Sequence, residues 1–275
     1  MLQALALVCG LLLTAASVAQ PSFTDEVPYV RTGQAVVDAM LELAGVRAND
    51  FLIDLGSGDG RIVIAAAKRY GARGFGVEID PRLVKESNER ALAEGVSDRA
   101  LFYEQDIFKT ELDAASVITM YLLPEYNLAL RPRLLALKPG TRVVSHDWDM
   151  GDWQHDASVE VAVPDKPVGL KKSSTVHLWI VPARVEGQWR SRLAPGGRDV
   201  QFELQQKFQE LSGTVTIGGR RLALERATLK GTWLSFRVQD GKRTLRFSGH
   251  ITAGRIAGQL GIGERSYRWR ALRAE

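Results

Sequence analysis

The sequence predicts an α/β fold, in which a mostly parallel sheet carries helices on both faces and a small all-β barrel or sandwich follows it. From residue 51 onward, short β-rich runs alternate with helical patterns, which is typical of βαβ units. Beyond Gly187 the pattern changes to alternating strands separated by glycine-containing turns. The 275 residues suffice for one or two hydrophobic cores, and 45% apolar with 25% charged residues is the composition of a globular protein.

Five β-rich runs make up the predicted sheet, and they occur in the order FLIDLG, FGVEID, ALFYEQD, SVITMYLL and TRVVSHDW. Helical patterns lie between most of them, and these run from Gly60 to about Tyr70, from FGVEID to Ala93, and from about Pro124 to Leu137. A further helix is expected before the first strand, where Thr32 or Gly33 could cap it. Its apolar residues repeat with a period of 3.6, and they are Val36, Val37, Met40, Leu41 and Leu43.

The second half of the chain begins with a polar segment, residues 151 to about 174, which we expect to be a connection without strands. STVHLWIVPARV then predicts a strand that could close the sheet. In the all-β part, LSFRVQDGKRTLRFSGHI predicts a hairpin with its turn at Asp240 and Gly241. We therefore expect an α/β domain over residues 25–185 and a basic all-β accessory domain over residues 187–275.

Residues 1–19 are apolar and end in small residues, with Ser17 and Ala19 at the −3 and −1 positions of a signal-peptidase site. The interpretation that we favour is a cleaved signal peptide and an exported, periplasmic protein; the alternative is an uncleaved membrane anchor, because about 18 apolar residues span a bilayer. The one cysteine, Cys9, lies in this segment, so thiol and disulfide chemistry is not expected in the rest of the chain.

Charge is distributed unevenly, since residues 201–275 carry 14 Lys and Arg against 6 Asp and Glu. The basic residues are spread singly along strand-like segments, which favours an ordinary solvated face. Contact with an anionic membrane or envelope surface is the alternative. We expect no specific binding of nucleic acid, and no group of His, Asp and Glu has the spacing of a metal site.

The strongest chemical signal is DLGSGDGR at residues 54–61, where an apolar strand turns into a helix. Its glycines give G-x-G-x-G; a dinucleotide fingerprint would need a glycine at Arg61, and the Gly-Lys-Ser/Thr of a phosphate-binding loop is absent. Such a turn lets the backbone and a helix N-terminus approach a ligand closely. Glu78 and Asp106 end the next two strands at the same sheet edge, and a carboxylate such as Glu78 can accept ribose hydroxyls.

DLGSGDGR, followed by GVEID and EQDIF, resembles motifs I, II and III of the class I, Rossmann-like S-adenosylmethionine (AdoMet)-dependent methyltransferases over roughly residues 27–150. The resemblance implies AdoMet as cofactor, with contacts in three groups. The methionine end would be held by Asp54, Gly56 and Gly58, the ribose by Glu78, and the adenine by Asp106 with Ile107. Ser57, Gly60 and Ile79 would also contact the cofactor. Tyr29 and Thr32, before the first helix, would complete the site.

The flanking segments VPYVRTGQAVVDAML, TMYLLPEYNLALRPRLLALKPGTRVVSHDW and MGDW are similar to bacterial relatives of the ATP synthase c-subunit lysine methyltransferase and, more distantly, to Dot1-like lysine methyltransferases. This resemblance implies a protein lysine amine as the acceptor. Arg31 stands where those relatives usually have proline. A lysine must be neutral to accept a methyl group, and aromatic, dehydrated surroundings favour that form.

Tyr121, His146 and Asp147 follow the fourth and fifth strands and are the candidates for positioning the acceptor. Each also has a structural explanation: packing for Tyr121, a satisfied hydrogen-bonding role for His146, and a turn cap for Asp147. Two other functions are retained as alternatives. One is a methyltransferase acting on a small molecule or lipid, because the motifs define the cofactor better than the acceptor. The other is a non-catalytic, exported protein that binds AdoMet or an anionic surface.

Overall fold

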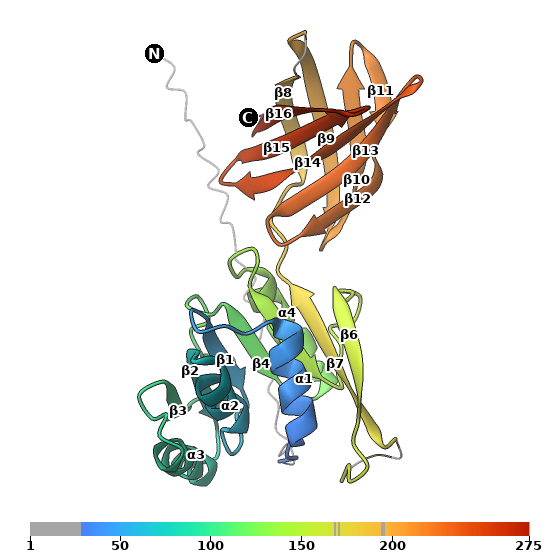
Figure 1. Cartoon of the computed structure of the whole chain (residues 1–275). Helices are drawn as coiled ribbons and strands as arrows, with labels where there is room; N and C mark the ends of the chain where they lie inside the picture. The colour runs from blue at the N-terminus through green and yellow to red at the C-terminus, as the bar shows by residue number, and fades with distance from the viewer. Residues whose placement is uncertain (1–28, 168, 170, 194–195, 275) are drawn as a thin grey trace, which may run out of the picture.

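The computed structural model describes residues 29–167, 169, 171–193 and 196–274, and it contains two sheets, one above the other in Figure 1. The signal or anchor segment predicted over residues 1–19 lies outside the described residues. None of the described helices is long and apolar enough to cross a membrane.

The first sheet has seven strands in the order β3-β2-β1-β4-β5-β7-β6. Its strands are β1 (Phe51–Leu55), β2 (Arg73–Glu78), β3 (Ala100–Glu104), β4 (Val117–Met120), β5 (Arg142–His146), β6 (Ala157–Ala162) and β7 (Ser173–Ile180). β1 to β5 are parallel to their neighbours, whereas β7 is antiparallel to β5 and to β6. The strand order reverses at β1, so the ends of β1 and β4 border the crevice where ligands of such sheets bind.

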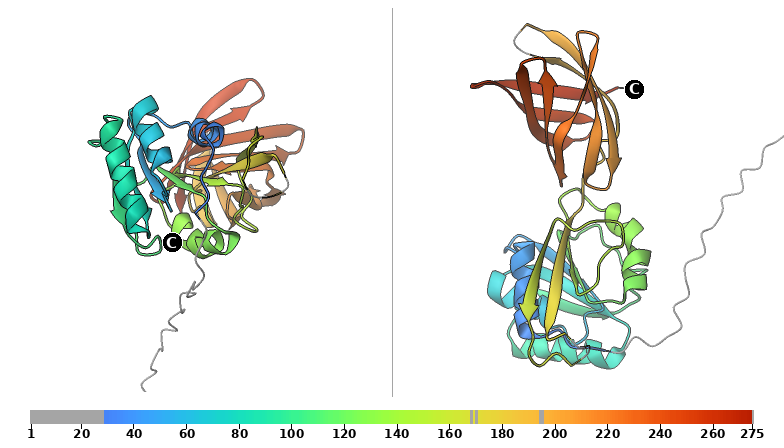
Figure 2. Two further views of the ribbon diagram at one scale, coloured as in Figure 1. Left: turned by 90° about the horizontal axis from the view of Figure 1, so that it is seen from below. Right: turned by 90° about the vertical axis from the view of Figure 1, so that its right-hand side faces the viewer.

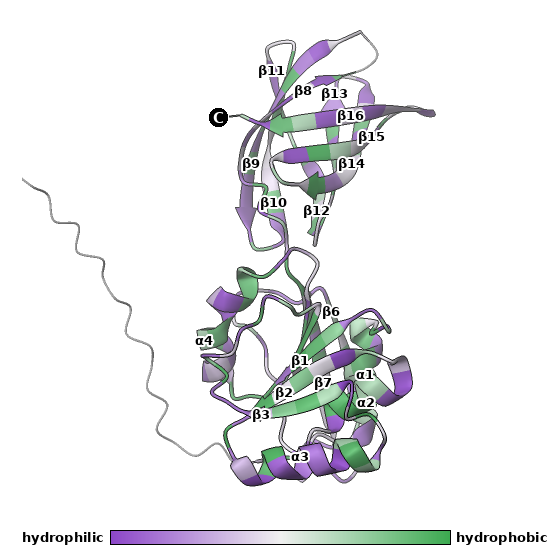
Figure 3. Cartoon of the chain, turned by 90° about the vertical axis from the view of Figure 1, so that its left-hand side faces the viewer, coloured by the Kyte–Doolittle hydropathy of each residue, from purple (hydrophilic) through white to green (hydrophobic). Residues whose placement is uncertain are grey.

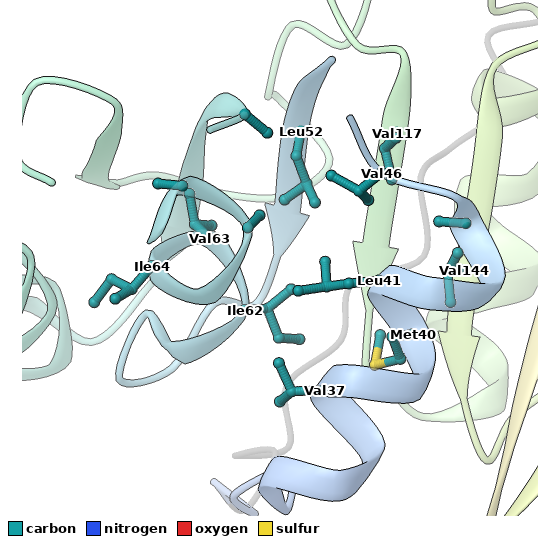
Figure 4. Packing of buried hydrophobic residues seen from close by; sticks show 14 of the residues in the cluster. Val37, Met40, Leu41, Val46, Leu52, Ile62, Val63, Ile64, Val117 and Val144 are labelled. Atoms are coloured by element: carbon teal, nitrogen blue, oxygen red, sulfur yellow. The ribbon is translucent and has the colours of Figure 1, made fainter. Parts of the chain in front are cut away.

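Helices cover both faces of this sheet, as predicted. The helices are α1 (Gln34–Ala44), α2 (Arg61–Tyr70), α3 (Pro81–Ala93) and α4 (Pro124–Leu135). The first three share a core with one face, and Figure 4 shows α1 and α2 side chains such as Leu41 and Ile62 meeting Leu52 of β1. α4 packs on the opposite face through Leu130 and Leu134.

The prediction for residues 151–174 was wrong, because β6 lies within this segment and forms the edge of the sheet. Its sequence ASVEVA alternates, so that Ala157 and Val161 pack against the α1 side of the core while Val159 is exposed. Charged residues and prolines around this short edge strand hide the alternation in the sequence. β7 was predicted correctly as a strand, but it lies between β5 and β6 instead of closing the sheet.

The second sheet is a nearly closed antiparallel barrel in which nine strands follow the order β11-β10-β9-β8-β16-β15-β14-β13-β12. Its strands are β8 (Gly187–Leu193), β9 (Arg198–Lys207), β10 (Glu210–Ile217), β11 (Arg220–Ala223), β12 (Glu225–Lys230), β13 (Trp233–Asp240), β14 (Arg243–Thr252), β15 (Arg255–Ile262) and β16 (Arg265–Arg273). The predicted hairpin is β13 and β14, and its two-residue turn is Gly241–Lys242, one position later than expected. Figure 3 shows apolar and polar residues alternating along β14, β15 and β16, and the apolar set fills the barrel core.

The continuation of β7 joins the two sheets (Figure 2). Side chains of the β9–β10 turn add a second contact between them. Phe208 of that turn stacks on Trp153, with ring centroids 6.0 Å apart. Gln209 accepts a hydrogen bond of 2.9 Å from Nε1 of Trp153, which is almost fully buried. The barrel therefore holds the segment that follows β5, the same segment that begins with the candidate residue Asp147.

Candidate active site

The glycine loop after β1 has the backbone geometry that close approach to a ligand requires. Gly56, Gly58 and Gly60 have φ values of 74°, 54° and 74°, in the left-handed region that favours glycine. Gly60 precedes α2 directly, so the N-terminus of that helix opens toward the crevice. A Cβ atom on Gly58 would lie 2.4 Å from Cε2 of Tyr29, which shows that the Tyr29 ring covers this loop.

Asp54 is a buried carboxylate with one free oxygen. Its Oδ1 accepts a hydrogen bond of 2.7 Å from the Thr119 hydroxyl, whereas Oδ2 has no partner among the described residues. Burial raises the pKa of Asp54 to about 7, a shift that the Thr119 hydrogen bond opposes and the nearby Glu78 and Asp59 increase. An unpaired buried oxygen of this kind fits a cationic or hydrogen-bond-donating ligand, because a bound donor would remove the cost of its burial.

Glu78 and Asp106 lie at the same sheet edge, as predicted. Glu78 accepts hydrogen bonds from the backbone N–H groups of Gly58 and Ile79, at 3.0 and 2.7 Å. These bonds fix the carboxylate across the start of the loop and leave lone pairs on both oxygens. Asp106 accepts from the N–H of Phe108 at 2.8 Å.

The other predicted cofactor residues are placed around this crevice. Ile79 is 70% exposed, so its side chain is free to contact a ligand, whereas Ile107 packs against the α4 side of the core. The hydroxyl of Ser57 is buried and, like Oδ2 of Asp54, has no partner in the described part of the chain. Together these residues form a crevice along the ends of β1, β2 and β3 with two unsatisfied buried oxygen atoms.

A cavity of about 360 Å³ lies beside this crevice, near the ends of β4 and β5. Tyr121 and His146 line it and stack on each other, with ring centroids 3.8 Å apart. The segment before α1 and the β6–β7 loop provide most of the remaining lining, which includes Arg31, Arg61 and Lys166. Of the predicted positioning residues, Tyr121 and His146 thus share one wall, and Asp147 lies behind it.

His146 is a neutral, hydrogen-bonded wall residue. Its Nδ1 lies 3.2 Å from the Thr32 hydroxyl and its Nε2 lies 2.8 Å from the Ser174 hydroxyl, so both ring nitrogens are occupied. Burial lowers the pKa of His146 to about 4, although the Asp147 carboxylate opposes that shift. At neutral pH the imidazole is uncharged, and its hydrogen bonds suit it to hold the wall in place.

Asp147 adopts a left-handed backbone conformation with φ of 62°, which only a minority of non-glycine residues do. Its Oδ1 accepts from the N–H of Thr175 at 2.9 Å, and its Oδ2 accepts from Nζ of Lys166 at 2.7 Å. Burial by itself would raise the pKa of Asp147, but the hydrogen bonds from Lys166 and Thr175 outweigh it and hold the pKa below its usual value. The Asp147 side chain is therefore an ionised carboxylate that can pair with a cation.

Several residues of the site were not identified from the sequence. Lys166 lies in the segment that was interpreted as a polar connection, and Ser174 was assigned only to a strand. Arg61 was noted as a departure from a dinucleotide motif, yet it donates to the Thr32 carbonyl at 2.6 Å and pairs with Asp59. No motif marks Lys166 and Ser174, because their partners Asp147 and His146 lie 19 and 28 positions away. Arg61 pairs locally with Asp59, but its bond to the Thr32 carbonyl spans 29 positions.

Comparison with known proteins identifies this arrangement. Residues 54–157 match the model of the ANTKMT methyltransferase domain. A protein-lysine N-methyltransferase of Saccharolobus islandicus is 41% identical over 162 residues, which is 58% of this chain and 97% of the relative. The human ATP synthase c-subunit lysine N-methyltransferase is 34% identical over 156 residues, covering 54% of this chain and 66% of the relative.

A solved structure agrees with the fold and the crevice. An RNA methyltransferase from Salinibacter ruber, crystallised with S-adenosyl-L-homocysteine, is 49% identical and superposes with a TM-score of 0.51, covering 57% of this chain and 96% of that one. The free oxygens of Asp54 and Ser57 and the left-handed glycines fit the methyl donor AdoMet. The chain is an AdoMet-dependent methyltransferase and belongs to the family that includes the Saccharolobus islandicus protein-lysine N-methyltransferase.

Proposed function

We propose that this methyltransferase transfers methyl groups to lysine side chains of a protein acceptor. The observation that carries the proposal is the stacked Tyr121–His146 wall of the cavity, because His146 is neutral and burial holds the pKa of Tyr121 above its usual value. An uncharged aromatic wall removes water from an entering amine and lowers its pKa, which favours the nucleophilic form. The lysine acceptors named for the archaeal and human relatives support the same choice.

The chain has to bind the cofactor and orient the acceptor. AdoMet, when bound, supplies a methyl carbon activated by the sulfonium, so that one in-line displacement forms the N–C bond and breaks the C–S bond. Asp54, Gly58 and Glu78 would hold its polar groups in the crevice, with Asp106 beyond them. Asp147 is a weak base because its pKa is lowered, so the amine would lose its proton to solvent before transfer.

The acceptor class can be tested with methyl-labelled AdoMet. The full-length protein is incubated with a cell extract from its own source, and the labelled material is separated into protein, RNA and lipid. We expect label in protein, with methyl-lysine as the labelled amino acid after hydrolysis. Asp54→Asn, which removes the ionisable carboxyl from the crevice, should lower the incorporation at least tenfold. Label confined to RNA or to lipid would contradict the lysine proposal and leave the methyltransferase activity intact.

We also propose that the barrel contacts an anionic membrane surface through an arginine face. This face consists of the outward-pointing side chains Arg190, Arg237, Arg246, Arg255, Arg268 and Arg270. They stand on five neighbouring strands, and the register places Arg246 directly opposite Arg237. None of the six has an ion pair among the described residues, and the outward positions of these strands carry no Asp or Glu.

Apolar side chains accompany these charges. Leu272, 60% exposed, lies opposite Arg255 and Arg190, and Trp233, 40% exposed, stands on β13 at the edge of the face. Exposed arginines next to apolar groups suit a lipid surface, where the charges meet headgroups and the apolar groups enter the interface. Lipid binding would bring the enzyme to acceptors at a membrane.

Vesicle sedimentation tests the arginine face. We expect binding to vesicles that contain phosphatidylglycerol, no binding to pure phosphatidylcholine, and loss of binding as the salt concentration rises. The triple variant Arg237→Gln, Arg246→Gln and Arg268→Gln should lose most of the binding. A matched variant, Arg220→Gln with Arg221→Gln, removes arginines that are already paired with Asp240 and Glu203 and should bind as the parent does. Binding to RNA but not to these vesicles would overturn the proposal.

Residues 1–19 provide a second route to a membrane in this proposal. We propose that they direct export of the protein, or anchor it, and they lie outside the described residues. Determining the N-terminal residue of the protein purified from its source tests this. A chain that starts after Ala19 supports cleavage and export, and a chain that keeps residues 1–19 in the membrane fraction supports an anchor. An uncleaved chain found only in the soluble fraction would contradict both.

A further inference from the structure

Lys166 places an amine beside the proposed acceptor wall. It belongs to the loop between β6 and β7, and its side chain is only 14% exposed. It lines the same cavity as Tyr121 and His146. Its Nζ donates to Oδ2 of Asp147 at 2.7 Å and to the carbonyl oxygen of Ser173 at 2.8 Å. A lysine of the chain itself thus lines the cavity where a lysine acceptor is proposed to enter, and its ammonium is held by two oxygens of residues just behind the lining.

The two oxygens that bind this ammonium are held in place by backbone hydrogen bonds that do not involve Lys166. The backbone N–H of Asp147 donates to the carbonyl oxygen of Thr175 at 2.7 Å, and the N–H of Thr175 donates back to Oδ1 of Asp147 at 2.9 Å. Ser173 begins β7, where its carbonyl is held by the strand. The carboxylate and the carbonyl therefore form a rigid pair of acceptors, which is the arrangement that a primary ammonium group requires.

The charges around this pair favour a cation at this point. His146 lies 3.5 Å from Oδ2 of Asp147 and is neutral. Arg61 also lines the cavity, but its charge is paired with Asp59. Asp165, beside Lys166, is the one acidic residue among the described residues of the lining. If Lys166 were absent, the Asp147 carboxylate would be left half-buried and unpaired, which is costly.

We propose that the Asp147 carboxylate and the Ser173 carbonyl are the binding site for the ammonium group of the incoming acceptor, and that Lys166 occupies this site until an acceptor displaces it. The inference rests on the proposed lysine acceptor. Asp147 then selects a primary amine in its charged form at the binding step, before the amine leaves this site and loses its proton to solvent for transfer. Lys166 acts as a built-in competitor. An internal competitor lowers the apparent affinity for every external amine, because its local concentration is high.

Binding of n-butylammonium, a mimic of the lysine side chain, tests the inference without cofactor or acceptor. Its binding to the full-length protein can be measured by NMR titration. We expect Lys166→Ala to bind the probe at least about tenfold more tightly than the parent, because the internal competitor is gone. Lys166→Arg keeps a cation at the site, so its affinity for n-butylammonium should stay as weak as that of the parent. The matched control Lys171→Ala removes an exposed lysine five positions away and should change nothing.

A second substitution assigns the gain to Asp147. In the Lys166→Ala background, Asp147→Asn should return the affinity to that of the parent or below it. If Lys166→Ala destabilises the chain, Lys166→Gln keeps a hydrogen-bond donor without the charge and should show the same direction of change. Folded variants that bind the probe no more tightly than the parent would overturn the inference.

The two proposals fail separately. Suppose that methyl-lysine appears in the labelled extract but Lys166→Ala does not bind n-butylammonium more tightly. This result would contradict the proposed Asp147 site and support the lysine acceptor. Tighter binding of n-butylammonium by Lys166→Ala, with label found only in RNA or lipid, would support the amine site and contradict the lysine acceptor.

Discussion

The Thr32 hydroxyl lies 3.2 Å from Nδ1 of His146, although 114 positions separate the two residues in the chain. The contact joins the segment before α1, which borders the cofactor crevice, to the end of β5, which forms the acceptor wall. One buried hydrogen bond therefore connects the cofactor side of the site to the wall of the cavity.

Thr32→Val tests this link. The substitution keeps the shape of the side chain but leaves a buried nitrogen of His146 without its partner, so we expect the free energy of unfolding to fall by about 1–2 kcal/mol. Methyl transfer should also slow, because the wall residue His146 keeps only its hydrogen bond to Ser174 and its ring is held less firmly. Urea denaturation and a labelled-methyl assay measure the two effects. Thr32→Ser retains the hydroxyl and should behave as the parent; equal losses in both variants would show that the hydroxyl is not responsible.

Asp54 makes AdoMet binding depend on pH. The pKa of Asp54 in the ligand-free protein is about 7, so the carboxyl is largely protonated at pH 6 and ionised at pH 8. Because the ionised form is the better partner for a cationic ligand, we expect the affinity for AdoMet to rise between pH 6 and pH 8. Calorimetric titration at several pH values measures this. Asp54→Asn should bind more weakly at every pH and should lose most of the rise; a rise of the same size in the variant would exclude Asp54 as its cause.

The same carboxyl affects the stability of the ligand-free protein. Its folded pKa, about 7, lies above the unfolded value of 3.8, so the ionised carboxylate is disfavoured by folding. The cost is full above pH 7, where it amounts to about 4 kcal/mol, and it disappears as the pH falls from 7 towards 4. We expect the Asp54→Asn protein to be more stable than the parent at pH 8 and to lose most of that advantage by pH 5. Denaturant titrations at the two pH values measure the difference, and an advantage that does not depend on pH would contradict the assignment.

Gly60 and Gly95 form a matched pair for testing the glycine loop. Both have φ near 70°, but a Cβ on Gly60 would lie 2.5 Å from Cζ of Phe102 and 2.9 Å from Cβ of Ser87, whereas nothing lies within 4 Å of the same position on Gly95. Gly95→Ala should therefore cost only the backbone strain of about 1 kcal/mol. Gly60→Ala should lower the free energy of unfolding by at least about 2 kcal/mol more than Gly95→Ala does, as measured by thermal unfolding. It should also weaken AdoMet binding, as measured by calorimetry. Similar costs at the two positions would mean that the loop tolerates the shift.

Phe208 tests the contact between the two sheets. Its ring stacks on Trp153 and also lies 5.6 Å from the guanidinium carbon of Arg131. Phe208→Ala removes both interactions, so we expect the methyltransferase part and the barrel to unfold in two separate calorimetric transitions where the parent shows more cooperative unfolding. Lys242→Ala, in the distant β13–β14 turn, is the control. A single unchanged transition in Phe208→Ala would show that the linkage does not depend on this ring.

The cofactor half of the fold could be predicted from the sequence because its signals are local. The glycines at 56, 58 and 60 follow a buried strand and precede a helix within one short stretch, and Glu78 follows at the next strand end. Parallel strands bring such ends to one edge, so the crevice follows from the order of the elements. The alternation of β13 and β14 around a glycine turn is equally local.

Only part of the acceptor half could be predicted in this way, namely Tyr121 and His146 at the ends of β4 and β5. β6 is a short edge strand whose partner β7 is reached only through a loop, and Lys166 lies in that loop. The pairing of Lys166 with Asp147 joins residues 19 positions apart that neither periodicity nor a motif connects. The same holds for Phe208 and Trp153, whose contact depends on how two separate sheets meet. These features arise from tertiary packing, which the spacing of residues along the chain does not encode.

The stacking of Phe208 on Trp153 means that the barrel buries a side chain of the methyltransferase part. The barrel therefore cannot be removed without exposing that side chain. The archaeal relative is matched over 97% of its length by only 162 residues, which leaves it no room for both a methyltransferase sheet and a nine-stranded barrel. Truncation of this chain after residue 186 would therefore not give an equivalent of that smaller enzyme. Trp153 would become exposed to solvent and form an apolar patch that favours aggregation. A stable enzyme without the barrel would therefore first need a polar residue in place of this tryptophan.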